Sequence, residues 1–297
     1  MTTPCASSFV RTTPPAWLDE PERACVPAGV DVFDAHVHLF PPRVFHAIWR
    51  WFDEHAWKVR YRLEAEQVVD YLTSRGVKKM CGLHYSHKPG MAEPLNDFVL
   101  DLAKSHPQVL PFATVLPGEP GARDIVKKAL RGGARGVKLH CHVQQMPADD
   151  PRLDEVYAEC ADAGRPVVIH AGREPNLGGY AVDVRALCGA DQVARALERH
   201  PRLKLVVPHL GADEYEAYAD LLDRFENLWL DTTMVIAGYF AQEPPSRLFP
   251  GRADRLLYGT DFPNIPYAWN RELDRVLAQG ETARRKVLWE NAQSLFD

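Results

Sequence analysis

The sequence predicts an α/β protein: a (β/α)8 TIM barrel formed by a single domain with an irregular N-terminal arm. Three observations support this. Short apolar runs without alternation recur eight times from residue 30 onward, amphipathic stretches separate them, and the repeat continues to residue 297. Unalternating apolar runs suit strands buried on both faces, as in parallel sheets covered by helices. An open doubly wound sheet is the alternative, but no Gly-X-Gly-X-X-Gly follows the first run.

The apolar runs occupy residues 30–38, 77–85, 109–116, 136–140, 166–170, 203–209, 228–232 and 256–261. The segments between them have helical signals, most clearly after the fourth run. There Asp150 can cap a helix, Pro151 suits its first turn and Gly164 can end it. The last helix is expected at residues 281–296, so that eight strand–helix units fill the barrel domain, residues 30–297.

The first 29 residues contain five prolines and have no periodic pattern. We interpret residues 1–29 as an irregular arm that packs on the barrel or on a partner subunit, as in a homodimer. A disordered tail is the alternative.

Composition excludes several classes of protein. A chain of 297 residues with 46% apolar and 25% charged residues is typical of a globular protein. A net charge of −5 without a basic run argues against nucleic-acid binding. No apolar run approaches the roughly 18 residues of a membrane span, and no secretory signal is evident. The six cysteines form no Cys-X-X-Cys pair, so a reducing cytoplasm is the expected compartment.

Ionisable residues gather where the predicted strands end. In order they are His36 and His38, His84, Lys138 with His140 and His142, His170, His209, and Asp261. Each alone could be a satisfied core residue, and alternation along the first strand would place Asp34, His36 and His38 on one face. Together, however, they would be costly to bury at one mouth without a partner. A metal ion bound by imidazoles and a carboxylate resolves that cost.

The chain resembles the amidohydrolase superfamily, and within it the amidohydrolase-2 group that includes aminocarboxymuconate semialdehyde decarboxylase-like enzymes. The resemblance covers residues 30–297. It rests on Asp34-Ala35-His36-Val37-His38, Gly136-Val137-Lys138-Leu139-His140, Ile169-His170-Ala171-Gly172, Pro208-His209-Leu210-Gly211, Tyr258-Gly259-Thr260-Asp261-Phe262-Pro263 and Glu290-Asn291-Ala292.

The resemblance implies that His36, His38, His170 and Asp261 hold a divalent metal, with Zn²⁺ expected first. It implies that His209 is a second-metal ligand or a residue that polarises the substrate. In binuclear relatives a carboxylated lysine at the fourth strand bridges two ions, so Lys138 could be a metal ligand. One ion is favoured here because His140 and His142 crowd that position. Otherwise, Lys138 would form an ion pair with a carboxylate such as Asp231.

Substrate-binding residues are expected near this metal. His140 and His142 would lie beside the substrate. The aromatic segment 44–61 follows the first metal motif, so Trp49 and Arg50 could line the pocket, and Arg50 or Arg173 could bind a substrate carboxylate.

The predicted function is a metal-dependent hydrolase that cleaves an ester, lactone or amide bond of a small molecule. Asp261 would act as ligand and general base towards a metal-activated water, and His209 would support the developing oxyanion. The alternative is a lyase, a metal-dependent non-oxidative decarboxylase or hydratase acting on an aromatic or enol carboxylic acid. A binding barrel without catalysis is disfavoured because it gives the buried histidines no purpose.

Overall fold

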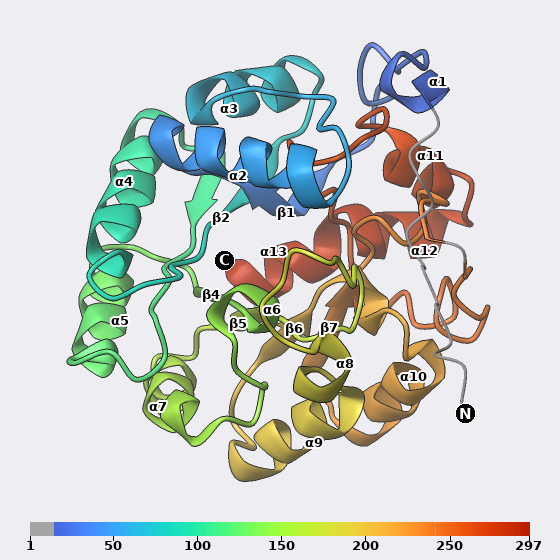
Figure 1. Cartoon of the computed structure of the whole chain (residues 1–297). Coiled ribbons are helices and arrows are strands. Elements are labelled where there is room, and N and C mark those ends of the chain that lie inside the picture. Colours follow the sequence, from blue (N-terminus) through green and yellow to red (C-terminus); the bar gives the residue numbers. More distant parts are fainter. Residues whose placement is uncertain (1–14, 241) are drawn as a thin grey trace, which may run out of the picture.

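The computed structural model describes residues 15–240 and 242–297, so residues 1–14 of the predicted arm lie outside the described part of the chain. Within the described residues, eight strands alternate with helices around a ring (Figure 1). The strands are β1 (Phe33–His38), β2 (Lys79–Leu83), β3 (Val109–Pro111), β4 (Val137–His140), β5 (Val167–His170), β6 (Leu205–Val207), β7 (Leu228–Asp231) and β8 (Leu256–Leu257). Each lies within one of the predicted apolar runs.

The strands form a closed parallel barrel. Ladders join β1–β2–β3 and β4–β5–β6–β7–β8, each strand beside its neighbour in sequence. Backbone hydrogen bonds close the two gaps. The Lys138 N–H donates to the Ala113 carbonyl at 2.7 Å between β3 and β4, and the Ala35 N–H donates to the Tyr258 carbonyl at 2.8 Å between β8 and β1. The predicted (β/α)8 barrel is therefore confirmed.

Helices surround the strands (Figure 1). They are α1 (Pro15–Leu18), α2 (Pro42–His55), α3 (Ala65–Ser74), α4 (Ala92–Ser105), α5 (Ala122–Arg131), α6 (Cys141–Gln144), α7 (Asp154–Asp162), α8 (Val184–Leu187), α9 (Ala190–Arg199), α10 (Tyr215–Arg224), α11 (Arg271–Leu277), α12 (Glu281–Arg285) and α13 (Asn291–Phe296), with 3-10 turns at Pro151–Leu153 and His209–Gly211. The predicted last helix is continuous through a π-helical turn, Lys286–Glu290, between α12 and α13. Among these described helices, none combines the length and the apolar character needed to cross a membrane.

The predicted signals around Asp150 work as expected, with one difference. The Asp150 carboxylate accepts a hydrogen bond from the Arg152 N–H at 2.9 Å. Pro151 begins a 3-10 turn, and α7 follows only from Asp154. Gly164, with φ of 66°, lies just beyond the end of α7.

Two apolar clusters organise the core. The larger cluster packs the outer faces of the strands against the surrounding helices. The smaller joins residues from the strands, including Phe33 and Phe112, to the last helix. Phe296 of α13 lies 5.8 Å from Phe33 and 5.4 Å from Phe112, between ring centroids. Because Phe33 begins β1, α13 fills the N-terminal end of the barrel, and the opposite end is left for a functional site.

Strand β1 departs from simple alternation. Its pairing with β2 shifts register between Asp34 and Val37. Phe33 and Ala35 belong to the smaller core cluster, whereas Val37 belongs to the larger one. The prediction that Asp34 shares the face of His36 and His38 is wrong. Its carboxylate instead accepts hydrogen bonds from the Thr260 hydroxyl at 2.6 Å and from the Thr260 and His36 N–H groups.

The described part of the N-terminal segment is anchored to the barrel by two carboxylates. Glu20 accepts hydrogen bonds from Nε and Nη2 of Arg271, at 2.7 Å each. Glu22 accepts hydrogen bonds from the Tyr61 and Tyr71 hydroxyls at 2.6 Å and from Arg75 at 2.9 Å. These contacts tie residues 20–22 to α3 and α11.

Candidate metal centre

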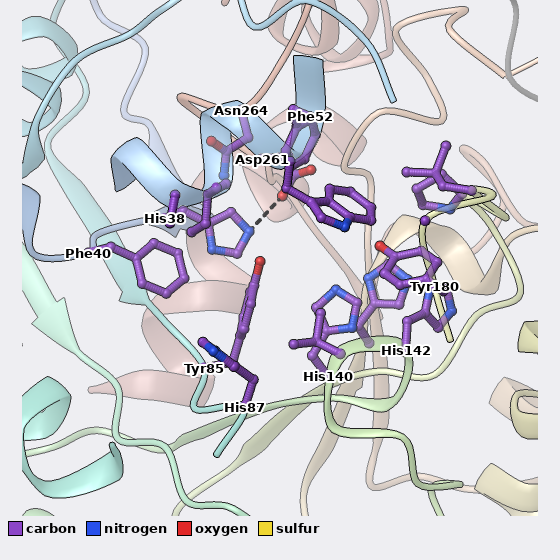
Figure 2. Close-up of a pocket in the computed structure, with 18 of the residues that line it drawn as sticks. His38, Phe40, Phe52, Tyr85, His87, His140, His142, Tyr180, Asp261 and Asn264 are labelled. Atoms are coloured by element: carbon purple, nitrogen blue, oxygen red, sulfur yellow. Dashed lines mark hydrogen bonds and ion pairs between the residues drawn. The ribbon is translucent and has the colours of Figure 1, made fainter. Parts of the chain in front are cut away.

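A cavity of about 430 Å³ opens at the C-terminal ends of the strands (Figure 2). Its floor carries most of the ionisable residues predicted from the strand ends. These are His36, His38, Lys138, His140, His142, His170, His209 and Asp261. The barrel brings them together because parallel strands deliver their carboxyl ends to one face.

Two histidines and one aspartate form the first group of potential metal ligands. One ligand atom from each of His36, His38 and Asp261 lies within 4.8 Å of the others. Asp261 Oδ1 is 2.9 Å from His38 Nε2 and 3.4 Å from His36 Nε2. Three ligand atoms on one divalent ion at about 2.1 Å are separated by about 3–3.5 Å, so this spacing fits an ion. Figure 2 shows His38 pointing at Asp261.

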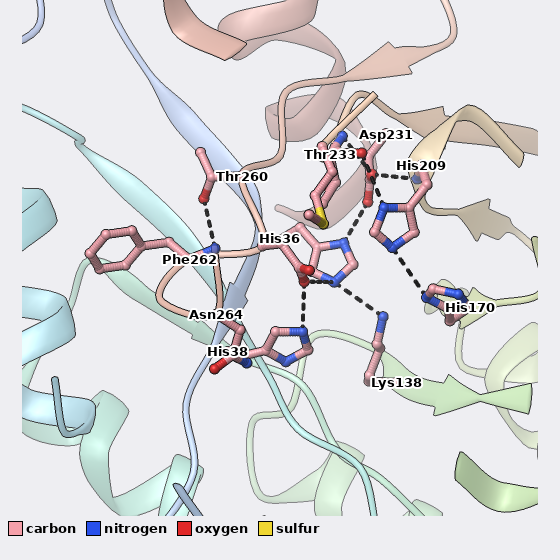
Figure 3. A network of polar contacts seen from close by, with 12 residues as sticks. His36, His38, Lys138, His170, His209, Asp231, Thr233, Thr260, Phe262 and Asn264 are labelled. Atoms are coloured by element: carbon pink, nitrogen blue, oxygen red, sulfur yellow. Dashed lines mark hydrogen bonds and ion pairs between the residues drawn. The ribbon is translucent and has the colours of Figure 1, made fainter. Parts of the chain in front are cut away.

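Asp231, at the end of β7, holds His36 in one orientation. Its Oδ2 accepts a hydrogen bond from His36 Nδ1 at 2.8 Å, and its Oδ1 accepts from the His209 N–H at 3.1 Å (Figure 3). A carboxylate only accepts, so the His36 proton is on Nδ1 and the lone pair of Nε2 faces the site. This carboxylate–histidine pair is a common second layer of metal centres. From the sequence, Asp231 was expected only as an ion-pair partner of Lys138.

Lys138 lies beside the first group rather than in an ion pair. Its Nζ is 3.3 Å from His36 Nε2, and the side chain is fully buried. Burial lowers the pKa of Lys138 to about 8, although the carboxylates of Asp231 and Asp261 oppose that shift. Lys138 can therefore lose or gain a proton near neutral pH.

Electrostatics keeps Asp231 and Asp261 charged and His36 neutral. Burial, followed by the charge of Lys138, lowers the pKa of His36 to about 4. Burial opposes ionisation of Asp231, but the charge and hydrogen bond of His36 lower its pKa to about 2. Burial also opposes ionisation of Asp261, and the His38 hydrogen bond still places its pKa below the usual range. Asp231, Asp261 and His36 thus have the protonation states that metal binding needs, and an ion would displace only the proton that His38 Nε2 donates to Asp261.

Three further histidines form a second group. One nitrogen each from His140, His142 and His170 lies within 4.8 Å of the others. His140 and His170 stack with centroids 4.2 Å apart and planes at 7°. His170 Nδ1 is 3.2 Å from His209 Nε2. His170, which the resemblance places with His36, His38 and Asp261, is thus grouped here with the histidines of β4 and α6.

Two site residues have unusual backbone conformations. Asp261 has φ of 66° and His209 has φ of 59°. Residues other than glycine rarely adopt this left-handed region, and such strain gathers at functional sites. The turns that follow β6 and β8 therefore hold both side chains over the cavity at a conformational cost.

Two predicted substrate residues on α2 lie outside the cavity. The residues of α2 that line it are Val44, Ala47, Ile48, Trp51 and Phe52. This is the i, i+3, i+4, i+7, i+8 stripe of one helix face. Trp49 and Arg50 fall off that stripe. Trp49 is buried against Phe45 with centroids 5.4 Å apart, and Arg50 is exposed.

Arg173 also lies outside the cavity lining. Its Nε donates to the Cys188 carbonyl at 3.0 Å, and its Nη1 is 3.2 Å from Glu214 Oε1. The ion pair with Glu214 compensates the positive charge of Arg173. Among the described residues that line the cavity there is no arginine, and Lys138 is the one lysine.

Aromatic side chains form the walls, and Tyr180 is the one among them that had no signal in the sequence. Tyr85 follows β2, Tyr180 comes from the loop before α8, and Phe52 comes from α2 (Figure 2). Trp51, also of α2, lines the same cavity. Tyr180 packs between Trp51 and His142, with centroids 5.1 and 5.0 Å away. The density of tryptophan in the segment 44–61 was a signal, but it did not show which of these side chains face inward.

Fold and site together define an enzyme class: a (β/α)8 barrel whose mouth carries a His-X-His pair, further histidines and an aspartate suited to a metal. A family model described as Amidohydrolase, of the Amidohydro_2 type, matches residues 33–297. The chain therefore belongs to the amidohydrolase-2 family, as its motifs predicted.

Solved structures share this fold at low sequence identity. An uncharacterized TIM-barrel protein of Bordetella bronchiseptica is 22% identical, with a TM-score of 0.69, covering 90% of this chain and 98% of that one. A 2,6-dihydroxybenzoate decarboxylase from Rhizobium is 16% identical, with a TM-score of 0.66, covering 90% and 98%.

A dihydroxybenzoic acid decarboxylase from Polaromonas sp. JS666, with bound manganese and the inhibitor 2-nitroresorcinol, is 16% identical, with a TM-score of 0.67, covering 90% and 97%. A search of curated proteins finds no match.

Proposed function

We propose that this chain is a metal-dependent decarboxylase that releases carbon dioxide from an aromatic or enol acid with an oxygen substituent beside the carboxylate. This is the lyase alternative of the sequence analysis, now preferred to the hydrolase. The observation that carries it is the cavity itself: metal-type ligands and one buried lysine at the floor, under aromatic walls. The decarboxylases among the structural neighbours support it.

The first group of ligands would hold the ion. His36 Nε2 presents its lone pair to the site because Asp231 fixes the proton on Nδ1, and Lys138 Nζ lies 3.3 Å from that lone pair. His38 and Asp261 add a second imidazole and a charged oxygen at matching distances. Two imidazoles and a carboxylate suit zinc and also manganese, so we propose a first-row divalent ion of this kind. When bound, the ion would draw electron density from the substrate oxygens and so weaken the bond to the carboxylate carbon.

The walls select a flat substrate of moderate size. Tyr85, Trp51, Phe52 and Tyr180 surround a cavity of about 430 Å³, which admits a substituted benzene ring. With Lys138 as the one cationic side chain among the described residues of the lining, the cavity suits one carboxylate better than two. Arg50 and Arg173, which were expected to bind a substrate carboxylate, lie outside this lining.

Lys138 would supply the proton that the reaction consumes. When the carbon–carbon bond breaks, carbon dioxide leaves, the electron pair stays on the ring carbon, and that carbon takes a proton. A lysine with a pKa of about 8 holds a proton at neutral pH and can release it. We assign this step to Lys138 Nζ, which solvent then reprotonates.

The protonation of His209 supports a lyase over a hydrolase. His209 Nδ1 donates to the Thr233 carbonyl at 3.1 Å, and burial lowers the pKa of the ring. The neutral ring therefore has no proton on Nε2 with which to stabilise an oxyanion. The hydrolase role predicted for His209 would need a protonated, buried imidazolium.

A substrate panel tests the proposal. Full-length protein loaded with Zn²⁺ or Mn²⁺ is assayed with hydroxybenzoates for carbon dioxide release and with lactones, esters and amides for hydrolysis. We expect carbon dioxide release that a chelator abolishes and that re-addition of metal restores. Hydrolysis of a lactone or amide without any decarboxylation would overturn the proposal and restore the hydrolase prediction.

A further inference from the structure

We propose that the cavity takes a two-ring hydroxy acid: an aromatic acid whose carboxylate-bearing ring is extended by a second, uncharged ring. The first ring would lie over the ionisable floor. The second would lie between α2 and the loop that follows β5, residues 171–183. The inference rests on the proposed decarboxylase function for the reaction itself, and it adds the class of substrate.

The lining of the cavity has a polar end and an apolar end. Among the described lining residues there is no arginine or glutamate, and the one lysine and one aspartate, Lys138 and Asp261, belong to the floor. The apolar end comes from the stripe of α2 described above and from Pro175, Leu177 and Tyr180 of the loop after β5. A charged group would lose its hydration there without gaining a partner of opposite charge, so the part of the substrate bound at this end is uncharged.

The cavity is larger than a one-ring substrate needs. At the packing density of a protein interior, an organic molecule occupies about 20 Å³ per non-hydrogen atom. A hydroxybenzoate therefore fills about 200 Å³, roughly half of the cavity of about 430 Å³. The unfilled half would hold water against apolar walls, which is unfavourable. A second ring brings the molecule to about 280–320 Å³ and leaves room for an ion and a water.

The aromatic side chains of the apolar end offer stacking surfaces. Trp51 and Tyr180 lie with ring centroids 5.1 Å apart and planes at 39°, and Phe52 and Trp57 lie 5.0 Å apart at 74°. Trp51, Phe52 and Tyr180 are only half-buried and line the cavity, so part of each ring is open to it. Figure 2 shows the rings of Phe52, Tyr85 and Tyr180 around one space. A flat ring can pack against such surfaces offset or edge to face.

The two walls of the apolar end are held against each other. A Cβ at Gly179 would lie 2.6 Å from His55 Cγ and 2.8 Å from Trp51 Cζ2, so the loop after β5 approaches α2 as closely as glycine allows. On its other side the loop is tied by the Glu174 N–H, which donates to the Ala212 carbonyl at 2.9 Å. A preformed space of this kind favours a rigid ring over a flexible chain, which would lose more conformational freedom on binding.

Two acids that differ by one fused ring test the inference. Full-length protein loaded with Mn²⁺ or Zn²⁺ is assayed with 2-hydroxybenzoate and 1-hydroxy-2-naphthoate for release of carbon dioxide with phenol or 1-naphthol, and isothermal titration measures the Kd of each acid. We expect kcat/KM about 10-fold higher and Kd about 10-fold lower for the naphthoate, because it buries the additional ring. Equal values for the two acids, or a preference for the hydroxybenzoate, would overturn the inference.

A variant that fills the apolar end separates this end from the floor. Ala47 lines the cavity from α2 and is exposed, so A47F adds a ring there without burying it in the core. We expect A47F to abolish the preference for the naphthoate, so that the ratio of the two Kd values falls about 10-fold. R50F is the matched control, because it adds the same ring to the same helix at an exposed position outside the lining, and it should keep the ratio.

A second variant guards against a folding defect in A47F. Y180A removes a stacking surface instead of adding a ring, and it should weaken binding of the naphthoate by about 3- to 10-fold relative to the hydroxybenzoate. A wild-type ratio of Kd values in both A47F and Y180A would overturn the inference, because the second ring would then lie elsewhere.

The outcomes distinguish this inference from the proposed function. Tighter binding of the naphthoate that A47F abolishes, without carbon dioxide release from either acid, would refute the decarboxylase and support the two-ring site. Carbon dioxide release from the hydroxybenzoate together with weaker binding of the naphthoate would support the decarboxylase and refute the two-ring site.

Discussion

At the scale of single residues, the site depends on which nitrogen of each histidine carries a proton. His36 illustrates this, because its Nδ1–H donates a hydrogen bond to Asp231, which leaves Nε2 for a metal. The His36–Asp231 contact joins residues 195 positions apart in the chain. The His-X-His motif was visible in the sequence, but its supporting carboxylate was not identified as such.

Replacing Asp231 by asparagine should weaken binding of the metal ion by about 10- to 100-fold, because the His36 ring loses its fixed proton. Isothermal titration of stripped protein with Zn²⁺ measures the change. The control is E272Q. Burial raises the pKa of Glu272 to about 8, so its carboxyl group is already neutral at pH 7 and the substitution should leave affinity unchanged. Equal affinity in D231N and wild type would contradict the role of Asp231.

Replacing Lys138 by methionine should lower kcat/KM for decarboxylation about 100-fold, the usual range for losing one proton donor. In the wild type, activity should fall as pH rises through about 8, because the Lys138 ammonium then loses the proton that the ring carbon needs. The pH–rate profile measures this. K79M is the control: it makes the same change at the start of β2, at the end of the barrel away from the cavity, and should keep the wild-type profile. A K138M profile that still falls near pH 8 would exclude Lys138 as the proton donor.

At the scale of elements, the barrel positions the site through close contacts between strand ends. Gly259, just after β8, is one such contact. A Cβ there would lie 2.4 Å from Thr233 Oγ1 and 2.9 Å from His36 Cβ. The absence of a side chain therefore lets β8 approach both β1 and the turn after β7.

The variant G259A should lower the free energy of unfolding by about 1–3 kcal/mol, as overpacking does, and should also weaken metal binding by displacing His36. Urea unfolding and zinc titration measure the two effects. G280A is the control, because a Cβ at Gly280 meets nothing within 4 Å. Wild-type stability in G259A would show that β8 can move away without cost.

The elements also show where sequence periodicity was sufficient. The eight runs, the cap at Asp150 and the final helix followed from local patterns and were confirmed. The inward stripe of α2 could have been found from its period of 3.6 residues, which separates Trp51 and Phe52 from Trp49 and Arg50. The register shift in β1 had no local signal, because it results from pairing with β2.

At the scale of the whole molecule, the barrel buries many neutral histidines. Burial lowers the pKa values of His36 and His84 to about 4, below the ordinary 6.5. Between pH 6.5 and 4 the unfolded chain therefore binds more protons than the folded chain. The stability that these residues contribute is present above pH 6.5 and is lost as the pH falls through that window.

The metal-free protein should lose about 2 kcal/mol of unfolding free energy per such histidine between pH 6.5 and pH 5. Urea unfolding at both pH values, with chelator, measures the loss. H84Q removes one titrating ring outside both metal groups and should reduce the loss accordingly. A stability that does not change over this interval would contradict the lowered pKa values.

The sequence by itself determined the barrel and which potential metal ligands lie at its mouth. Strand periodicity and the motifs around His36, His170, His209 and Asp261 are local, and parallel strands must deliver their ends to one face. The tertiary structure alone decided how those residues divide. In the folded chain His36 donates to Asp231, Arg173 forms an ion pair with Glu214, and His170 lies beside His140 and His142. Hydrogen bonds and ion pairs between segments distant in sequence fix these orientations.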